Sequence, residues 1–138
     1  MKKTLFFLLF SLTLSVFAMG QTTEILMRGS DGAVVDTVSN TGTGYVQARV
    51  LIPTDLVGIQ AVLEKLSGST QGTVKLFGSI DGTNFTQISS DTLAATDAAS
   101  QSKIFFVPSP IVPFYRVVFE GAGTHSTVLS AIALSIKK

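Results

Sequence analysis

Residues 72–89, GTVKLFGSIDGTNFTQIS, contain the pattern that decides the fold. The first half alternates, with Val74 and Leu76 on one face of an extended segment and Lys75 on the other. Asp81-Gly82 then supplies the residue of positive φ that a tight turn between paired strands requires. A second extended segment follows the turn. The stretch therefore predicts a β-hairpin.

Segments of the same kind occupy most of the chain after residue 20. They are rich in Thr, Ser, Val, Ile and Gly, which is typical of strands separated by tight turns. The further strands expected are 24–28, 33–38, 45–52, 103–107, 114–119 and 127–136. The turn at 29–32 is expected to join the first two as a hairpin. About seven to nine short strands at this spacing predict an all-β fold, an antiparallel, jelly-roll-like β-sandwich.

Two segments have a weaker pattern. Residues 55–66 fit both a helical stripe and a strand, and Gly58 favours the strand because glycine weakens a helix by about 1 kcal/mol relative to alanine. Residues 91–102 are small and polar with little periodicity, so they are expected to form a long surface loop. The strand 45–52 should end at Pro53, which cannot donate a backbone hydrogen bond.

Two strands carry apolar residues on both faces. Phe105 and Phe106 must point to opposite faces of their strand, so one of them lies either under a loop or on an exposed patch that invites a partner. The segment 127–136 alternates larger aliphatic residues with Leu129, Ala131 and Ala133. It should bury one face and pack closely on the other.

Residues 1–20 have the three-part layout of a secretory signal. Lys2 and Lys3 precede a short apolar run, and Ala18-Met19-Gly20 fits the small-x-small cleavage rule, which would leave Gln21 as the N-terminus. A cut after Ala18 is the second choice. The run is shorter than the ~20 residues of a membrane-spanning helix, which favours a cleaved signal over the alternative, a retained membrane anchor. We expect a signal peptide over 1–20, one β-sandwich domain over 21–138, and export to the periplasm, the cell surface or the medium.

Charge and cysteine content exclude several classes of function. Without Lys2 and Lys3, eight of the ten basic side chains remain against nine acidic ones, a net charge of −1. No cluster of basic residues remains to recognise a nucleic acid. The sequence contains no cysteine, which excludes thiol chemistry and cysteine-based zinc sites. No cofactor is expected.

No catalytic constellation is recognisable. His125, the single histidine, lies in a Gly/Thr/Ser turn and is expected to be solvated, because a general base needs a positioned partner. The acidic residues are scattered singly, so no facing pair suggests glycoside hydrolysis. Asp31 and Asp81 each precede glycine and are interpreted as turn formers rather than calcium ligands. We expect no catalytic residue, no metal site and no enzymatic activity.

The residues outside the predicted core fall into two groups. The candidate binding residues are Tyr45, Phe114, Tyr115 and Arg116; the sequence has no tryptophan and only these two tyrosines. Ser79, Asp81, Gly82, Asn84 and Phe85 are expected to form the structural turn of the hairpin, with the aromatic ring plugging it.

Two stretches carry a resemblance to known proteins. The strand, G-S-x-D-G-x-N-aromatic turn and strand within 65–85, together with PFYRVVFEG at 113–121, resemble small β-sandwich structural proteins of tailed-phage and prophage virions. The hairpin is shared with galactose-binding-like jelly rolls. The resemblance implies a virion-associated structural role. The leader departs from it, because typical virion proteins are assembled in the cytoplasm.

These observations favour a non-enzymatic structural or assembly protein, associated with a virion or a cell surface. It would act through self-association or protein contacts, with the strands 45–52 and 127–136 pairing between copies if they lie at sheet edges. The alternative is a secreted adhesion or carbohydrate-binding module with its site on the loops 39–44, 91–102 and 121–126. A membrane is a partner only if the leader is retained.

Overall fold

The structure is a computed structural model that describes residues 21–29, 31–51 and 54–137. Its strands are β1 Gln21–Leu26, β2 Val35–Ser39, β3 Thr43–Arg49, β4 Leu56–Gly68, β5 Gln71–Ser79, β6 Thr86–Gln87, β7 Leu93–Ala95, β8 Ser100–Pro108, β9 Phe114–Ala122 and β10 His125–Lys137. The described residues include no helix with the length and hydropathy that crossing a bilayer requires. The predicted signal peptide, Ile52 and Pro53 lie outside the described residues.

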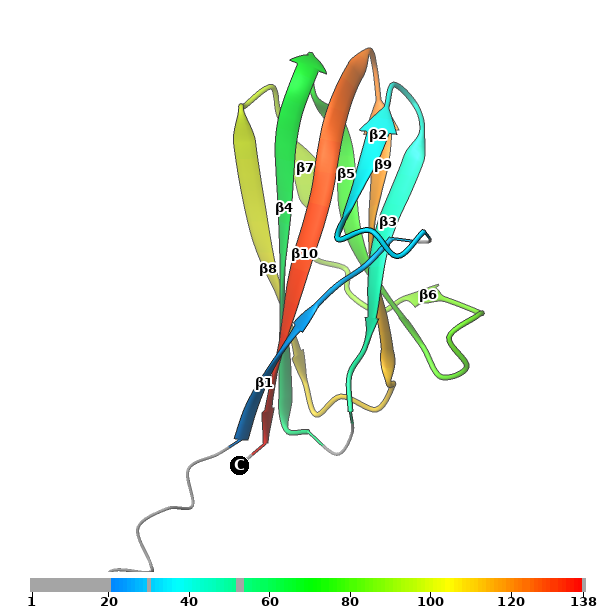
Figure 1. Ribbon diagram of the computed structural model, residues 1–138, viewed down its shortest axis with the longest axis vertical. Helices are drawn as coiled ribbons and strands as arrows, with labels where there is room; N and C mark the ends of the chain where they lie inside the picture. Colours follow the sequence, from blue (N-terminus) through cyan, green and yellow to red (C-terminus); the bar gives the residue numbers. More distant parts are fainter. Residues whose placement is uncertain (1–20, 30, 52–53, 138) are drawn as a thin grey trace, which may run out of the picture.

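Two antiparallel sheets pack face to face, as the sequence predicts (Figure 1). Sheet A has the strand order β1-β10-β4-β8, with β2 also paired to β10. Sheet B has the order β3-β9-β5-β6, with β7 also paired to β5. The β-sandwich is therefore confirmed. The short strands β6 and β7 raise the number of strands in the described chain slightly above the range expected.

The core lies between the sheets and follows the two-residue period of the strands. Val57, Ile59, Ala61 and Leu63 of β4 are all buried, which confirms the strand interpretation of 55–66. Sheet B contributes larger side chains from β9, including Tyr115 and Phe119, to the same cluster. The remaining buried residues of the core are Met27, Val38, Val46, Val50, Val74, Leu76, Phe105, Val117, Leu129, Ala131 and Ala133.

The hairpin at 72–89 is confirmed. Phe77 pairs with Gln87 and Gly78 with Thr86 across the turn. The returning strand is short: β6 consists of two residues, and the amide of Ile88 makes one further hydrogen bond to the carbonyl of Leu76.

The hairpin expected around 29–32 is not formed. β1 and β2 each pair with β10 and not with each other. Asp31-Gly32 does make a turn, with Gly32 at φ 83° and the Ala33 amide bonded to Asp31. The chain also changes sheets here, since Arg28 forms a bridge to Gln47 of β3. A local turn signal does not specify which strands will pair.

Two further expectations are wrong. The segment 91–102 is not one loop, because it contains β7 and the start of β8. The segment 127–136 is not an edge: β10 lies between β4 on one side and β1 and β2 on the other. Strand pairing at these places is determined by contacts distant in sequence, which composition does not reveal.

Candidate functional site

The outer face of sheet A carries two neighbouring rows of residues that run across four strands and include five large apolar side chains. The register places Phe106 beside Gly58, Gly58 beside Leu134 and Leu134 beside Glu24. A second row consists of Ile104, Gln60, Ile132 and Leu26. Cross-strand partners point to the same face, so the two rows form one continuous surface. We call Leu26, Ile104, Phe106, Ile132 and Leu134, with Gly58 and Gln60 between them, the apolar face.

The apolar face is open to solvent. Phe106 is 67% exposed, Ile104 47%, Leu26 46%, Ile132 42% and Leu134 40%. The neighbouring Phe105 is buried in the core, so the two phenylalanines take opposite faces as predicted and Phe106 occupies the exposed patch. Exposed apolar side chains grouped in this way make the face a candidate interaction surface.

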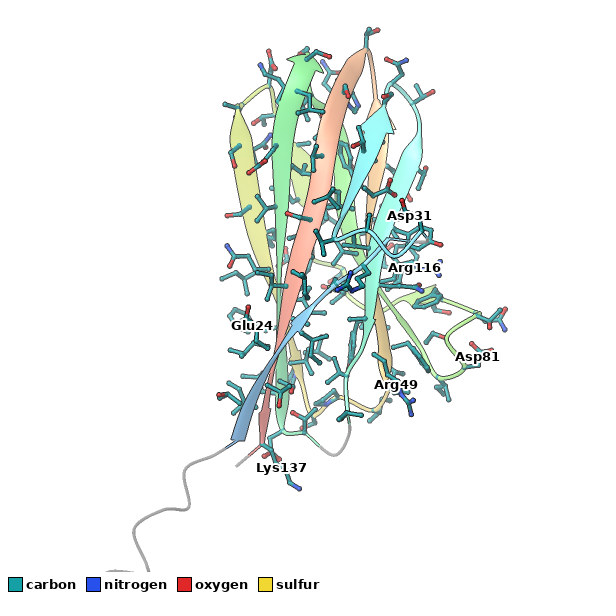
Figure 2. All side chains as sticks on the ribbon, viewed as in Figure 1. Glu24, Asp31, Arg49, Asp81, Arg116 and Lys137 are labelled. Carbon is teal, nitrogen blue, oxygen red and sulfur yellow. The ribbon has the colours of Figure 1, made fainter. Side chains whose placement is uncertain are left out.

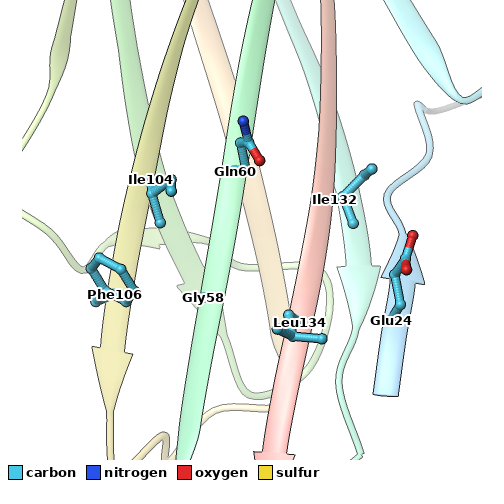
Figure 3. A pocket seen from close by; sticks show the side chains of 7 residues that line it. All are labelled: Glu24, Gly58, Gln60, Ile104, Phe106, Ile132 and Leu134. Carbon is cyan, nitrogen blue, oxygen red and sulfur yellow. The ribbon is translucent and has the colours of Figure 1, made fainter. Parts of the chain in front are cut away.

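Gly58 forms a depression in the middle of this face (Figure 3). It has no side chain, while Phe106 stands on β8 and Leu134 on β10 to either side of it. The hollow has a volume of about 390 Å³ and is lined by Glu24, Gly58, Gln60, Ile104, Phe106, Ile132 and Leu134. The exposed ring of Phe106 therefore borders a hollow on the same face.

The orientation of β10 explains why large aliphatic residues remain outside. Its inward residues are Leu129, Ala131, Ala133 and Ser135, which are small apart from the first. The opposing sheet contributes large rings to the core, and small residues opposite large ones fill the space between sheets without strain. Ile132 and Leu134 therefore point outward.

The structure places three of the four predicted binding residues on one face and buries the fourth, Tyr115. Tyr45 and Arg116 lie on the outer face of sheet B, with the guanidinium carbon 4.0 Å from the centre of the tyrosine ring. Phe114 lies on the same face under Arg49, at 5.6 Å. Tyr115 points into the core and is fully buried, so it is not part of any binding surface. Burial raises the pKa of Tyr115 to about 12.

Phe85, which the sequence predicts to be part of the hairpin turn, also contacts Arg116. Its ring covers the other side of Arg116, with the guanidinium carbon 3.7 Å from the ring centre. Gln47, which the sequence did not single out, accepts hydrogen bonds from Nε of Arg116 at 3.1 Å and Nη2 at 2.7 Å. The only signal in the sequence was its place next to Tyr45 on the polar face of a strand.

The hairpin turn is organised by Asp81. Its Oδ1 accepts hydrogen bonds from the backbone amides of Thr83 and Asn84 and from the hydroxyl of Ser79. These bonds, with one from the Asn84 side chain to Oδ2, hold the pKa of Asp81 well below its usual range. Gly82 has φ 74°, as the turn prediction requires. Asp81 therefore acts in the turn, as expected.

His125 is not the solvated loop residue that the sequence suggests. It is the first residue of β10 and is buried. Its Nδ1 lies 3.0 Å from the hydroxyl of Thr127, which lies 3.0 Å from the hydroxyl of Thr70. Nε2 has no hydrogen-bond partner in the described part of the chain. Residues 21–29, 31–51 and 54–137 contain no group of three or more His, Cys, Asp or Glu that could hold a metal ion.

Comparison with known proteins shows the fold alone. No protein-family model and no curated protein matches the chain. A Family 16 Carbohydrate Binding Module-2 structure is 15% identical, with 71% of this chain and 73% of that chain covered and a TM-score of 0.48. A structure described as "CBM4 structure and function" is 18% identical, with 80% and 78% covered and a TM-score of 0.48. A structure of infectious bursal disease virus Gx strain is 14% identical, with 86% of this chain and 32% of that chain covered and a TM-score of 0.50.

Proposed function

We propose that this protein is a non-enzymatic assembly protein whose copies associate through the apolar face of sheet A. The observation that carries the proposal is the exposure of five large apolar side chains in two adjoining rows of the same sheet. Burying such a side chain completely contributes about 1.5–3 kcal/mol. These five are 40–67% exposed in the single chain, so each contributes roughly half of that. The ten side chains of two copies together reach about 7–15 kcal/mol, which is of the same order as the roughly 4–15 kcal/mol that association costs in lost freedom of motion.

A second copy fits this face better than an unrelated surface does. Phe106, the most exposed of the five side chains, borders the hollow next to Gly58, so the same face offers both a ring to insert and a hollow to receive one. In a twofold arrangement, Phe106 of each copy enters the hollow of the other, and both contacts form together. The lining of the hollow includes a single charged residue, Glu24, which stands on β1 away from the Phe106 side. Like charges therefore do not oppose the approach of two copies over the hollow.

Export of the chain belongs to the same proposal. Lys2, Lys3 and the apolar run after them fit a cleaved signal, which would release the sandwich outside the cytoplasm. Assembly would then take place at the cell surface, in the medium or on a virion. Mass spectrometry of the protein recovered from an exporting host tests cleavage after Gly20, and an intact Met1 on the recovered chain would contradict it.

Sedimentation of the exported protein tests the association. The full-length gene is expressed, and the product is compared with its Phe106→Thr and Ile111→Thr variants over a range of concentrations. Ile111 is a matched control, because it is 86% exposed but lies outside sheet A. We expect concentration-dependent association of the wild type and of Ile111→Thr, and its loss in Phe106→Thr. A wild type that stays monomeric, or an equal loss in Ile111→Thr, would overturn the proposal.

A further inference from the structure

All the arginines of the sequence lie on one face of the sandwich, far from the apolar face. They are Arg28, Arg49 and Arg116. Arg28 forms a bridge to Gln47, and Gln47 pairs with Arg116 in the register of sheet B. Arg49 pairs with Phe114 in the next row. Cross-strand partners share a face, so the three side chains are on the outer side of sheet B, where Figure 2 shows Arg49 and Arg116 beside β3.

These arginines differ from the lysines in what they contact. Lys65, Lys75 and Lys103 each form an ion pair with a carboxylate. Within the described residues, no arginine has such a pair: Arg28 donates to the carbonyl of Gly32, and Arg49 and Arg116 lie against aromatic rings. The nearby Asp31 accepts a hydrogen bond from the amide of Ala33 instead. Asp36, next to Tyr45, likewise accepts from a backbone amide, that of Tyr45. Among the described residues, the arginines of this face therefore form no ion pair with a carboxylate.

Arg116 is held in a fixed orientation. The rings of Tyr45 and Phe85 cover both faces of its guanidinium, at 4.0 and 3.7 Å from the guanidinium carbon. Gln47 occupies one edge, accepting from Nε and Nη2 through a single oxygen. The other edge, formed by Nη1 and the second hydrogen of Nη2, has no partner in the described chain. Two parallel N–H groups on one edge match the two oxygens of a carboxylate.

A shallow hollow beside Arg116 could receive a small unit of a larger ligand. Gln47, which accepts hydrogen bonds from Arg116, is part of its lining. The other lining residues are Arg28, Gly29, Ala48, Arg49 and Phe114. The volume of the hollow is about 250 Å³. This is below the roughly 300–1,000 Å³ of pockets that enclose a whole small molecule. The hollow suits one ring-sized unit of a chain that continues along the open sheet.

We propose that this face binds a polysaccharide that carries carboxylates, of the uronic-acid type. The free edge of Arg116 and the exposed Arg49 would bind the carboxylates. The rings of Tyr45 and Phe85 and the amide of Gln47 offer the apolar surfaces and hydrogen bonds that sugar rings and hydroxyls use. An acidic peptide fits less well, because the outer edge of β3, the terminal strand of sheet B, is already occupied beside the site. The backbone of Gln47 is hydrogen-bonded to that of Arg28, and the amide of Tyr45 donates to the carboxylate of Asp36.

Binding to polygalacturonate tests the proposal, with methyl-esterified polygalacturonate as the matched probe that keeps the sugar rings and removes the charge. We expect the exported protein to bind the free acid and not the ester. Arg49→Gln and Arg116→Gln should each weaken binding about tenfold or more, since each removes charge-assisted hydrogen bonds. Lys103→Gln removes the same charge from sheet A and should leave binding unchanged.

Several results would overturn it. These are no binding to the free acid, equal binding to the ester, an equal effect of Lys103→Gln, or binding to poly-L-glutamate without binding to polygalacturonate. Arg116→Gln could also loosen the turn that Phe85 belongs to. Arg49→Gln avoids this, because Arg49 contacts only Phe114 among the aromatic rings, so unchanged binding by Arg49→Gln counts against the proposal as well.

Discussion

Phe106 and Leu134 stand in one row of sheet A, on either side of Gly58, and both point to solvent. Neither belongs to the core, and the glycine between them leaves a hollow that their side chains border. This relationship gives the outer face of the sheet both its apolar character and its shape. The first prediction concerns that shape.

Filling the hollow should weaken self-association while stabilising the single chain. A Cβ at Gly58 would meet the Phe106 ring at 3.8 Å, an ordinary contact, so Gly58→Val should fold. Glycine costs a strand about 0.5–1 kcal/mol, so the unfolding free energy should rise by about that amount. Sedimentation should show weaker association. Gln60→Val is the control, since it adds apolar surface beside the hollow without filling it. If Gly58→Val and Gln60→Val strengthened self-association equally, the contact would not depend on the shape of the face.

The hydroxyl of Tyr115 should be dispensable for folding. It is buried and has no hydrogen-bond partner in the described chain. Removing an unpaired buried polar atom relieves its desolvation cost, so Tyr115→Phe should raise the unfolding free energy by up to about 1–3 kcal/mol. Urea unfolding measures this, and a loss of stability would show that the hydroxyl has a partner.

The same substitution should change the alkaline stability. The pKa of Tyr115 is raised from 10.0 to about 12 in the folded protein. Between these values the unfolded chain releases a proton that the folded chain retains, so the unfolding free energy falls as the pH rises. Tyr115→Phe should flatten this part of the stability profile. An unaltered decline in the variant would assign the effect to other groups.

The hydroxyl of Thr127 should be needed for stability. It lies between the hydroxyl of Thr70 and Nδ1 of His125, at 3.0 Å from each, and all three residues are buried. Thr127→Val keeps the shape but leaves two buried polar groups unpaired, which costs about 1–3 kcal/mol. Thr37→Val, at an exposed strand position, should be close to neutral in the same denaturant measurement. Equal effects of the two variants would contradict a buried network.

The turn at 80–85 should depend on the carboxylate of Asp81. Asp81→Ala removes the acceptor for the amides of Thr83 and Asn84, so their NMR signals and those of the Phe85 ring should shift and broaden. Asp97→Ala, an exposed carboxylate paired with Lys65, is the control. Because the pKa of Asp81 is lowered, its contribution to stability declines progressively as the pH falls below the usual aspartate range, while the carboxylate of the folded turn becomes protonated only well below that range. Broadening of the NMR signals of the turn near pH 4 in the wild type would contradict the lowered pKa of Asp81.

The hairpin at 72–89 could be predicted from the sequence because its local signal is strong: alternation, and a glycine of positive φ in the turn. Residues 55–66 fit a helix and a strand alike, and only Gly58 favours the strand that the structure contains. The turn at 29–32 has a signal similar to that of the hairpin but joins strands that do not pair. Its Asp-Gly specifies a local bend, while β10 decides where β1 and β2 go.

The functional surfaces depend on contacts that the sequence does not express. β10 is apolar on both faces, and only the large rings opposite it decide that the smaller residues turn inward. The Arg116 site joins Tyr45, Gln47 and Phe85, which belong to three separate segments. Phe105 and Phe106 are the exception: adjacent positions in a strand face opposite ways, so one exposed ring could be predicted.

Cross-linking of single cysteines tests the central claim most directly, because the sequence contains no cysteine of its own. Ile104→Cys and Leu134→Cys place a thiol on the apolar face while keeping Phe106, and Ile111→Cys places one on an exposed loop position outside it. If copies associate through this face, mild oxidation should give a covalent dimer at one or both face positions and much less at residue 111. Equal yields at all positions, or a dimer only at residue 111, would contradict association through sheet A.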